Sequence, residues 1–386
     1  MSVAVRALRA RHESRVEPIR FSSFNLELTN HCNMSCDYCP DGIMRRARGL
    51  MDVELARKVI DELAEKQMTN RIYFHLMGEP LLHPKFDELA KYIHEKGLKL
   101  AIFTNSSRLS DKNIDRILSV PIDGLLLSIH GTDAESFALR RAGGLSYESY
   151  IAGVESFFRK KVEQGHQGKV TMSYMMGDVR TGSPGDQLIV SKEQAEAVIQ
   201  SWRKFFVNLD PEGTASITPV PVNLTNFGRD YPLYPGVSLL LKASGLWDGS
   251  MVKEGYELRP SLTGYCERIS GRAVQGTFAV LWDGTATYCC VDYEGKLNLG
   301  NAREQTIEEI FRGPKATAIR ENELRGKLIH PTCQRCKGQI IDISKQRKVP
   351  KYRSGASLLY LASSFYRKNG FRRTVQRSID YLRKAY

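Results

Sequence analysis

Three cysteines lie close together near the start of this sequence, at Cys32, Cys36 and Cys39. Their spacing is C-x3-C-x2-C, and they directly follow an apolar, strand-like segment, Phe24 to Leu28. Three thiolates on one short loop can bind three irons of a [4Fe–4S] cluster, which leaves the fourth iron open to another ligand. Open coordination positions are where metal chemistry takes place, so this loop is the first candidate for a catalytic centre.

The remaining cysteines form a second group toward the C-terminus. They are Cys266, Cys289, Cys290, Cys333 and Cys336. Two such groups in a long chain, whose basic first twenty residues lack the apolar core of a secretory signal, do not resemble a disulfide framework. The pattern favours metal ligation by thiols in a reducing compartment, and we therefore expect a cytoplasmic protein.

The segments around the triplet alternate between strand-like and helix-like patterns. Strands are expected at 24–29, 71–76, 98–103, 124–129, 169–175 and 215–222, and helices at 53–67, 86–96, 111–118, 147–161 and 192–206. Such alternation is typical of parallel β/α units. Six units in series predict an α/β fold, a partial (β/α)6 barrel of the TIM type.

The C-terminal cysteines are predicted to belong to a smaller unit of their own. Asp283-Gly284 between the apolar runs 277–281 and 285–289 predicts a β-hairpin. We divide the chain into a basic extension (1–23), the barrel (24–222), an irregular connector (223–263), the cysteine-rich unit (264–340) and a basic amphipathic tail (341–386).

The formal charge of +13 is concentrated at the ends of the chain. From Ile341 to Tyr386 there are twelve Lys and Arg against two acids. A basic amphipathic, helical tail either packs its apolar stripe on the body or lies on an anionic membrane surface. The chain contains no run of eighteen apolar residues and no motif typical of nucleic-acid binding, so neither a spanning helix nor a nucleic-acid partner is expected.

The triplet, with Tyr38 directly before its third cysteine, resembles the signature of the radical S-adenosylmethionine (SAM) enzymes. The resemblance implies that the amino and carboxylate groups of SAM bind the open iron. An electron from the cluster then cleaves SAM to methionine and a 5′-deoxyadenosyl radical, which abstracts a hydrogen from the substrate. The cofactor supplies the difficult step, and the protein supplies orientation and protection.

Further residues lie where this family places its contacts with SAM. Met77-Gly78-Glu79-Pro80 resembles the family's Gly-Gly-Glu motif, with Met77 in place of the first glycine, and Ser128-Ile129-His130-Gly131 resembles its Ser-Ile-Asp-Gly run. Either Arg140 or Arg141 can correspond to the arginine that binds the SAM carboxylate. The predicted SAM-binding residues are Tyr38, Gly78, Glu79, Thr104, Asn105, Ser128, Arg140, Arg141 and Ser173.

The second cysteine group resembles the SPASM or Twitch region of the same superfamily. Cys266, Cys289, Cys333 and Cys336 are the predicted ligands, and no cysteine follows Cys336, which fits the shorter Twitch form with one auxiliary [4Fe–4S] cluster. A structural zinc on the same thiolates is the alternative. The spare thiol, Cys290 (or Cys289, if the register shifts by one), is either a small buried side chain or a catalytic hydrogen donor.

Three reactions are compatible with these features. The first is oxidation of an alcohol on a small sugar or amino-cyclitol-like substrate, with His130, Tyr174 or Asp178 as candidate bases. The second is epimerisation with Cys290 as hydrogen donor, and the third is modification of a peptide or protein. Each requires SAM, both clusters and an electron donor such as flavodoxin or ferredoxin. We favour the first, because only about twenty-three residues precede the first strand, too few for a peptide-binding domain.

Overall fold

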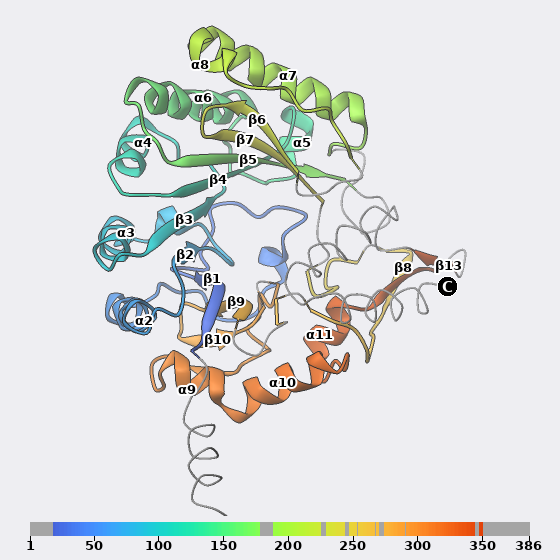
Figure 1. Ribbon diagram of the computed structural model, residues 1–386. Coiled ribbons are helices and arrows are strands. Elements are labelled where there is room, and N and C mark those ends of the chain that lie inside the picture. The colour runs from blue at the N-terminus through green and yellow to red at the C-terminus, as the bar shows by residue number, and fades with distance from the viewer. Residues whose placement is uncertain are drawn as a thin grey trace, which may run out of the picture.

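The computed structural model describes residues 18–177, 188–224, 229–243, 247–252, 254–266, 268–269, 274–289, 291–343 and 347–349. Ten strands form one curved sheet, and a row of helices covers its outer face (Figure 1). The strand order is β11-β10-β9-β1-β2-β3-β4-β5-β7-β6. A second sheet of three strands has the order β13-β12-β8.

Six parallel strands form the centre of the large sheet. They are β1 (Arg20–Leu26), β2 (Arg71–Phe74), β3 (Lys99–Thr104), β4 (Gly124–His130), β5 (Lys169–Met176) and β7 (Val237–Ala243). Their side chains alternate between two environments. On β4, for example, Leu125, Leu127 and Ile129 are buried against the helices, whereas Leu126 and Ser128 on the inner face are half-buried. The α/β barrel-like architecture expected from the sequence is confirmed.

The helices of the outer layer are amphipathic. They are α2 (Val53–Glu65), α3 (Phe86–Glu95), α4 (Asp111–Leu118), α6 (Tyr147–Glu163) and α7 (Lys192–Leu209), with the short helices η1 (Pro40–Ile43), η2 (Pro80–Leu82), α5 (Ala134–Ala138) and α8 (Pro211–Ala215) in the connections. In α2, the Asp52 carboxylate caps the N-terminus by accepting a hydrogen bond from the Glu54 N–H at 2.7 Å. Leu55, Val59 and Leu63 then pack one buried face against the sheet.

The sixth strand does not lie where the sequence predicted it. Residues 216–223 form no strand, and the sixth parallel strand is β7, inside the predicted connector. It forms a hairpin with the antiparallel edge strand β6 (Asp230–Tyr234). The apolar run at 215–222 was misleading because Pro219 and Pro221 have no backbone N–H, and a central strand needs these hydrogen-bond donors. Pro235-Gly236 was the turn signal that could have located the real strands.

The cysteine-rich unit continues the same large sheet. Its hairpin of β9 (Val274–Val280) and β10 (Thr285–Thr287) is confirmed, and β9 lies parallel to β1 along its whole length. The remaining elements are β8 (Tyr256–Arg259), β11 (Gly300–Asn301), α9 (Ile307–Arg312), α10 (Pro314–Leu324), α11 (Pro331–Cys336), β12 (Gln339–Asp342) and β13 (Arg347–Val349). The Glu62 carboxylate of α2 also accepts from Ile307 N–H at 2.6 Å, at the N-terminus of α9.

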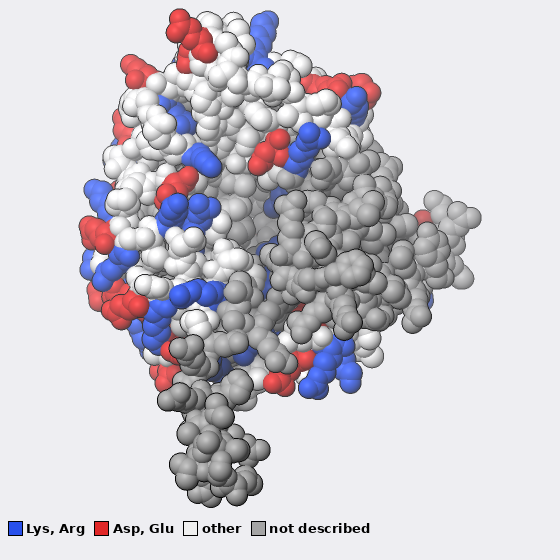
Figure 2. All heavy atoms as spheres, in the orientation of Figure 1, with Lys and Arg blue, Asp and Glu red and all other residues white. Residues whose placement is uncertain are grey.

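The surface of the body carries both signs of charge. On the face drawn in Figure 2, Lys and Arg side chains alternate with Asp and Glu over the described elements, and pairs such as Arg57–Glu88 join neighbouring helices. Of the predicted helical tail, residues 341–342 and 347–349 are strand, and residues 350–386 lie outside the described residues. No helix among the described residues is long and apolar enough to cross a bilayer.

Candidate active site

The cysteine triplet lies on the loop that leaves the carboxyl end of β1. The three side chains are partly exposed, and the Cys39 N–H donates to the Cys36 carbonyl at 2.9 Å, which tightens the second half of the loop. The Asn105 side-chain amide, from the end of β3, donates to Cys32 Sγ at 3.6 Å. Burial raises the pKa of the Cys32 thiol to about 11, so ionisation of this thiol is unfavourable in the apoprotein. Coordination of iron offsets this cost, because the metal takes the thiolate as its ligand.

The segment after β2 packs against the start of the loop that carries the triplet. Gly78 has a φ of +76°, and a Cβ at this position would lie 2.3 Å from the Thr29 carbonyl oxygen and 2.7 Å from that of His31. The Glu79 N–H donates to the same His31 carbonyl at 2.9 Å. Gly78, predicted as a cofactor-binding residue, therefore lies directly under the loop that carries the triplet.

Glu79 is fully buried and joins the ends of two strands. Its carboxylate accepts from Thr104 Oγ1 at 2.9 Å and from Asn105 N–H at 2.6 Å, both at the end of β3. Burial raises the pKa of Glu79 to about 7. The structure thus brings together three predicted residues, Glu79, Thr104 and Asn105, beside the triplet, and their contact with SAM stays a prediction.

The raised pKa of Glu79 predicts how the stability of the apoprotein depends on pH. The folded chain keeps this proton up to about pH 7, whereas an ordinary glutamate releases it near 4.5. Folding therefore binds a proton in that window, and stability falls as the pH rises through it, by about 3 kcal/mol in total. Urea unfolding of the apoprotein at pH 5 and pH 8 should show this loss, and Glu79→Gln should reduce it. An equal loss in the Gln variant would contradict the assignment.

The two candidate arginines have different environments. Arg140 is 1% exposed, and its guanidinium donates to the Ile129 carbonyl at 2.7 Å and to the Asn105 carbonyl at 2.9 Å, as well as to the Ser128 carbonyl. Arg141 is exposed and pairs with Asp37 of the cluster loop at 2.5 Å. Arg140 therefore fixes the ends of β3 and β4, whereas Arg141 lies at the rim of the site.

This difference predicts unequal effects on stability. Arg140→Gln should lower the free energy of unfolding by about 3 kcal/mol, because it leaves buried carbonyls without a charged donor. Arg141→Gln should cost less than about 1 kcal/mol, as is usual for an exposed ion pair. Chemical unfolding of both apoproteins compares them directly, and similar losses would contradict the roles inferred here.

The buried polar atoms beside the triplet fit a polar cofactor. Ser173 Oγ on β5 and His130 Nδ1 at the end of β4 are buried, and neither has a hydrogen-bond partner among the described residues. Ser128 and Ser173 are register partners on the inner face. The Tyr38 ring packs edge-on against His130 at 5.7 Å. Buried polar groups without a hydrogen-bond partner are unfavourable. The hydroxyl and the imidazole at this position therefore suit a bound polar molecule, such as the nucleoside part of SAM.

A residue that sequence reasoning missed connects the loop with the cysteine-rich unit. Glu27, buried directly after β1, accepts two hydrogen bonds from the Arg46 guanidinium. Its oxygens also accept from Met77 N–H and Trp282 N–H, both at 3.2 Å. Arg46 in turn donates to the Tyr293 carbonyl at 2.5 Å. The available signal was a charged residue at an inward position of the first strand, between Leu26 and Leu28.

Two of the C-terminal cysteines line a small hollow. They are Cys266 and Cys333, which line it together with apolar side chains such as Ile319 and Leu328. Among the described residues, no three His, Cys, Asp or Glu side chains converge closely enough for one metal ion. Four cysteine thiolates can hold either a [4Fe–4S] cubane or a single zinc ion. Cys290 lies outside the described residues.

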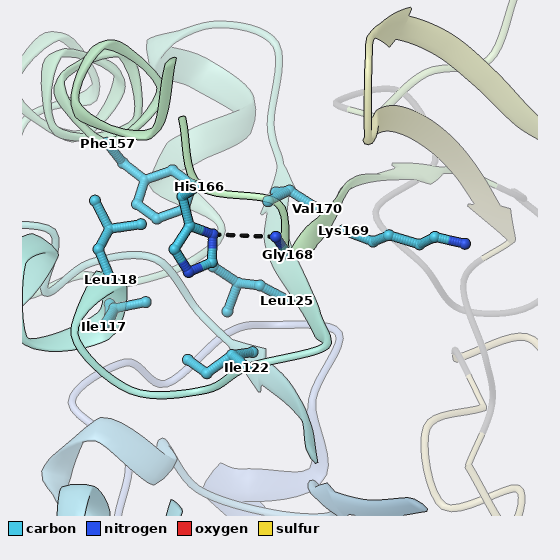
Figure 3. A pocket seen from close by; sticks show the side chains of 9 residues that line it. All are labelled: Ile117, Leu118, Ile122, Leu125, Phe157, His166, Gly168, Lys169 and Val170. Carbon is cyan, nitrogen blue, oxygen red and sulfur yellow. Dashed lines mark hydrogen bonds between the residues drawn. The ribbon is translucent and has the colours of Figure 1, made fainter. Parts of the chain in front are cut away.

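Another small cavity lies far from these groups. It is located under α4 and α6 at the amino ends of β4 and β5, where His166 Nδ1 accepts from the Gly168 N–H at 3.1 Å (Figure 3). Its walls are largely apolar, with Ile117, Leu125 and Phe157 among them. Because enzymes built on parallel barrels place their active sites at the carboxyl ends of the strands, this cavity is a packing defect in the helical layer.

Comparison with known families agrees with this geometry. The model of the radical SAM superfamily matches residues 26–184, and that of the SPASM iron–sulfur cluster-binding domain matches residues 266–337. The chain belongs to the radical SAM superfamily. It therefore carries a SAM-binding [4Fe–4S] cluster and SAM, and its SPASM domain implies auxiliary iron–sulfur binding.

Individual relatives of this radical SAM protein have different activities. A "tungsten-containing aldehyde ferredoxin oxidoreductase cofactor-modifying protein" of Pyrococcus furiosus is 24% identical over 333 residues, 81% of this chain and 86% of the relative. An "S-adenosyl-L-methionine-dependent 2-deoxy-scyllo-inosamine dehydrogenase" of Niallia circulans is 28% identical over 120 residues, 30% of this chain and 48% of the relative. SuiB of Streptococcus suis, solved with its precursor peptide SuiA, aligns with a TM-score of 0.52 at 12% identity, covering 82% of this chain and 70% of SuiB, and supports the fold alone.

Proposed function

We propose that this radical SAM enzyme oxidises an alcohol carbon of a small, polar, carbohydrate-like substrate. The observation that carries the proposal is the contact between the segment after the triplet and the cysteine-rich unit. The cysteine-rich unit holds the segment after the triplet through Glu294, whose carboxylate accepts from Arg45 N–H at 2.8 Å and Arg46 N–H at 3.0 Å. An auxiliary cluster with four thiolates has no open iron, so it suits electron transfer better than substrate ligation. The dehydrogenase among the relatives supports this reading.

Oxidation of an alcohol to a ketone removes two hydrogens in separate steps. When bound, the clusters and SAM supply a radical that takes the carbinol hydrogen atom and an acceptor for one electron. The hydroxyl proton must go to a base of the protein. His130 is the candidate that its position favours, because it lies at the end of β4 against Tyr38 of the cluster loop and its buried Nδ1 has no hydrogen-bond partner among the described residues. Burial, and after it the cations Arg140 and Lys242, hold its pKa well below the usual value, which keeps the imidazole neutral but makes it a weak base.

The other two candidate bases do not have this support. Tyr174 lies on the outer face of β5, where its hydroxyl accepts from the Trp202 indole at 2.7 Å, and burial raises its pKa far above the usual value. Asp178 lies outside the described residues. Tyr174 is therefore excluded as a base for chemistry inside the barrel.

Solvent labelling tests the proposed reaction. The anaerobically reconstituted enzyme is incubated in D2O with SAM, reductant and a panel of sugars and amino-cyclitols. We expect a product two mass units lighter than its substrate, without deuterium on the oxidised carbon. A product of unchanged composition that carries one carbon-bound deuterium would instead establish epimerisation, with Cys290 as the hydrogen donor to test by Cys290→Ala.

Two further outcomes would replace the proposed substrate class. Product formation on a peptide alone would establish peptide modification. Modification of a protein cofactor is the second candidate, favoured by the share of the chain that the Pyrococcus furiosus relative covers. The electron donor, a flavodoxin- or ferredoxin-type protein, is part of the proposal and would be identified by its ability to replace a chemical reductant in the same assay.

A further inference from the structure

The first cysteine of the triplet contacts a polar side chain from another part of the barrel. Asn105 lies directly after β3, and its side-chain amide donates to Cys32 Sγ at 3.6 Å and to Asn33 Oδ1 at 3.0 Å. Both acceptors belong to the loop that carries the triplet. One amide group therefore contacts a thiol that binds the cluster and also the residue that follows it.

Asn33, Asn105 and Ser107 form a closed ring of side-chain hydrogen bonds. The Asn105 amide donates to Asn33 Oδ1, and the Asn33 amide donates to Ser107 Oγ at 2.8 Å. The Ser107 hydroxyl and the Ser107 N–H donate in turn to Asn105 Oδ1, at 2.6 Å and 2.9 Å. A side-chain amide has two N–H donors and two acceptor positions, and all four are used here. The Asn105 side chain is therefore held with one N–H directed at the Cys32 sulfur.

The backbone of Asn105 is held by buried residues of the barrel. Its N–H donates to the Glu79 carboxylate at 2.6 Å, and its carbonyl accepts from the Arg140 guanidinium at 2.9 Å. The Tyr150 hydroxyl donates to the same carbonyl at 3.1 Å. All three partners are buried, so the barrel core, and not the exposed part of the loop, sets the position of the amide. The core thus presents a preorganised hydrogen-bond donor to the cluster loop.

We propose that Asn105 is a positioning residue for the initiating cluster: it orients Cys32 as an iron ligand and raises the reduction potential of the cluster through the hydrogen bond to its sulfur. Reduction adds negative charge to the cluster and its thiolates, so a donor at a thiolate sulfur stabilises the reduced form more than the oxidised form. The side chain of Asn105 then acts on the cluster, in place of the predicted contact with SAM. The inference does not depend on the substrate proposed above.

A redox titration of the reconstituted full chain tests this role. Electron paramagnetic resonance follows the reduced clusters against the solution potential, without SAM and without oxygen. The signal that changes when SAM is then added belongs to the initiating cluster. In Asn105→Ala we expect the potential of this cluster to become more negative. At a fixed solution potential, the ratio of reduced to oxidised cluster should fall about 3- to 10-fold, the usual effect of one hydrogen bond. The auxiliary cluster is the internal control and should keep its potential.

Ser107→Ala is the matched control variant. It removes the hydroxyl that closes the ring, but the Ser107 N–H still holds Asn105 Oδ1, and the Asn105 amide still faces Cys32. The potential of the initiating cluster should therefore stay unchanged. Asn105→Asp, a variant of the same size, should lower this potential as Asn105→Ala does, because a carboxylate cannot donate to the sulfur. Equal shifts in the Ser107 and Asn105 variants would indicate a general loosening of the loop and would overturn the inference.

SAM binding separates this role from the predicted contact with SAM. An unchanged potential in both Asn105 variants would overturn the inference, and weaker SAM binding in the same variants would then assign the side chain to SAM. Loss of about four irons from both Asn105 variants, with full iron in Ser107→Ala, would support the positioning of Cys32. None of these measurements uses a substrate, so their outcome is independent of the proposed alcohol oxidation.

Discussion

Replacing Gly78 with alanine is expected to prevent correct assembly of the initiating cluster and to slow SAM cleavage by about 100-fold or more, since small displacements of reacting groups have effects of this size. The added Cβ would lie 2.3 Å from the Thr29 carbonyl oxygen and 2.8 Å from Asn30 Cα, both backbone atoms of the loop that leads to Cys32. Backbone cannot move aside as the end of a flexible side chain can. The loop must therefore shift, and the three thiolates shift with it. Iron content and 5′-deoxyadenosine formation measure the two effects.

Gly143 provides a matched control for this substitution. Its φ is +63°, close to that of Gly78, but a Cβ there has no atom within 4 Å. Gly143→Ala therefore imposes the same unfavourable backbone conformation, which costs about 1–2 kcal/mol, without any steric contact. We expect the Gly143 variant to assemble its clusters normally. Equal loss of iron in both variants, or no loss in either, would contradict the prediction that Gly78 holds the triplet loop in place.

Glu27→Ala is expected to lower the free energy of unfolding by about 3–5 kcal/mol, the usual result of removing one partner from a buried ion pair. The substitution leaves the Arg46 guanidinium, whose side chain is 10% exposed, without its carboxylate. It also leaves the N–H groups of Met77 and Trp282 without their acceptor. Because these residues belong to three different segments, the cluster loop and the cysteine-rich unit should loosen together. Urea unfolding measures the loss, and the rate of iron release measures the loosening.

The pair between Arg57 and Glu88 is the control for this prediction. Both side chains are 37% exposed, so solvent screens the pair and Glu88→Ala should lower the free energy of unfolding far less than Glu27→Ala does. A loss below about 1 kcal/mol for Glu27→Ala would mean that Glu27 does not bind the two units together.

The strands and helices of the barrel were predictable where one face is apolar and the other is not. Residues 111–118 were predicted as a helix and form α4 over the same residues, because the apolar period and the stop signals agree there. The sixth strand was missed for the opposite reason. The run from Tyr231 to Leu241 is interrupted by prolines and a glycine, and only its pairing with β5 makes it a strand.

The site was predictable to the extent that its residues form local motifs. The triplet and the segment with Gly78 and Glu79 are each a short local motif, and the structure packs the second against residues 29–31, directly before Cys32. The choice between Arg140 and Arg141 was not predictable. Adjacent residues share the same local sequence pattern, and only the fold decides which of the two side chains faces the ends of the strands. Glu27 was missed for a related reason. It is an isolated polar residue whose importance comes from partners far away in the sequence.

Counting irons in cysteine variants tests the central claim, a radical SAM enzyme with two functionally distinct clusters, most directly. After anaerobic reconstitution, we predict about eight irons for the unsubstituted chain and about four for Cys36→Ala and for Cys333→Ala, as expected for two cubanes. Only the Cys36 variant should lose SAM cleavage, whereas the Cys333 variant should still form 5′-deoxyadenosine but no oxidised product. About four irons in the unsubstituted chain, unchanged by Cys333→Ala, would contradict the account.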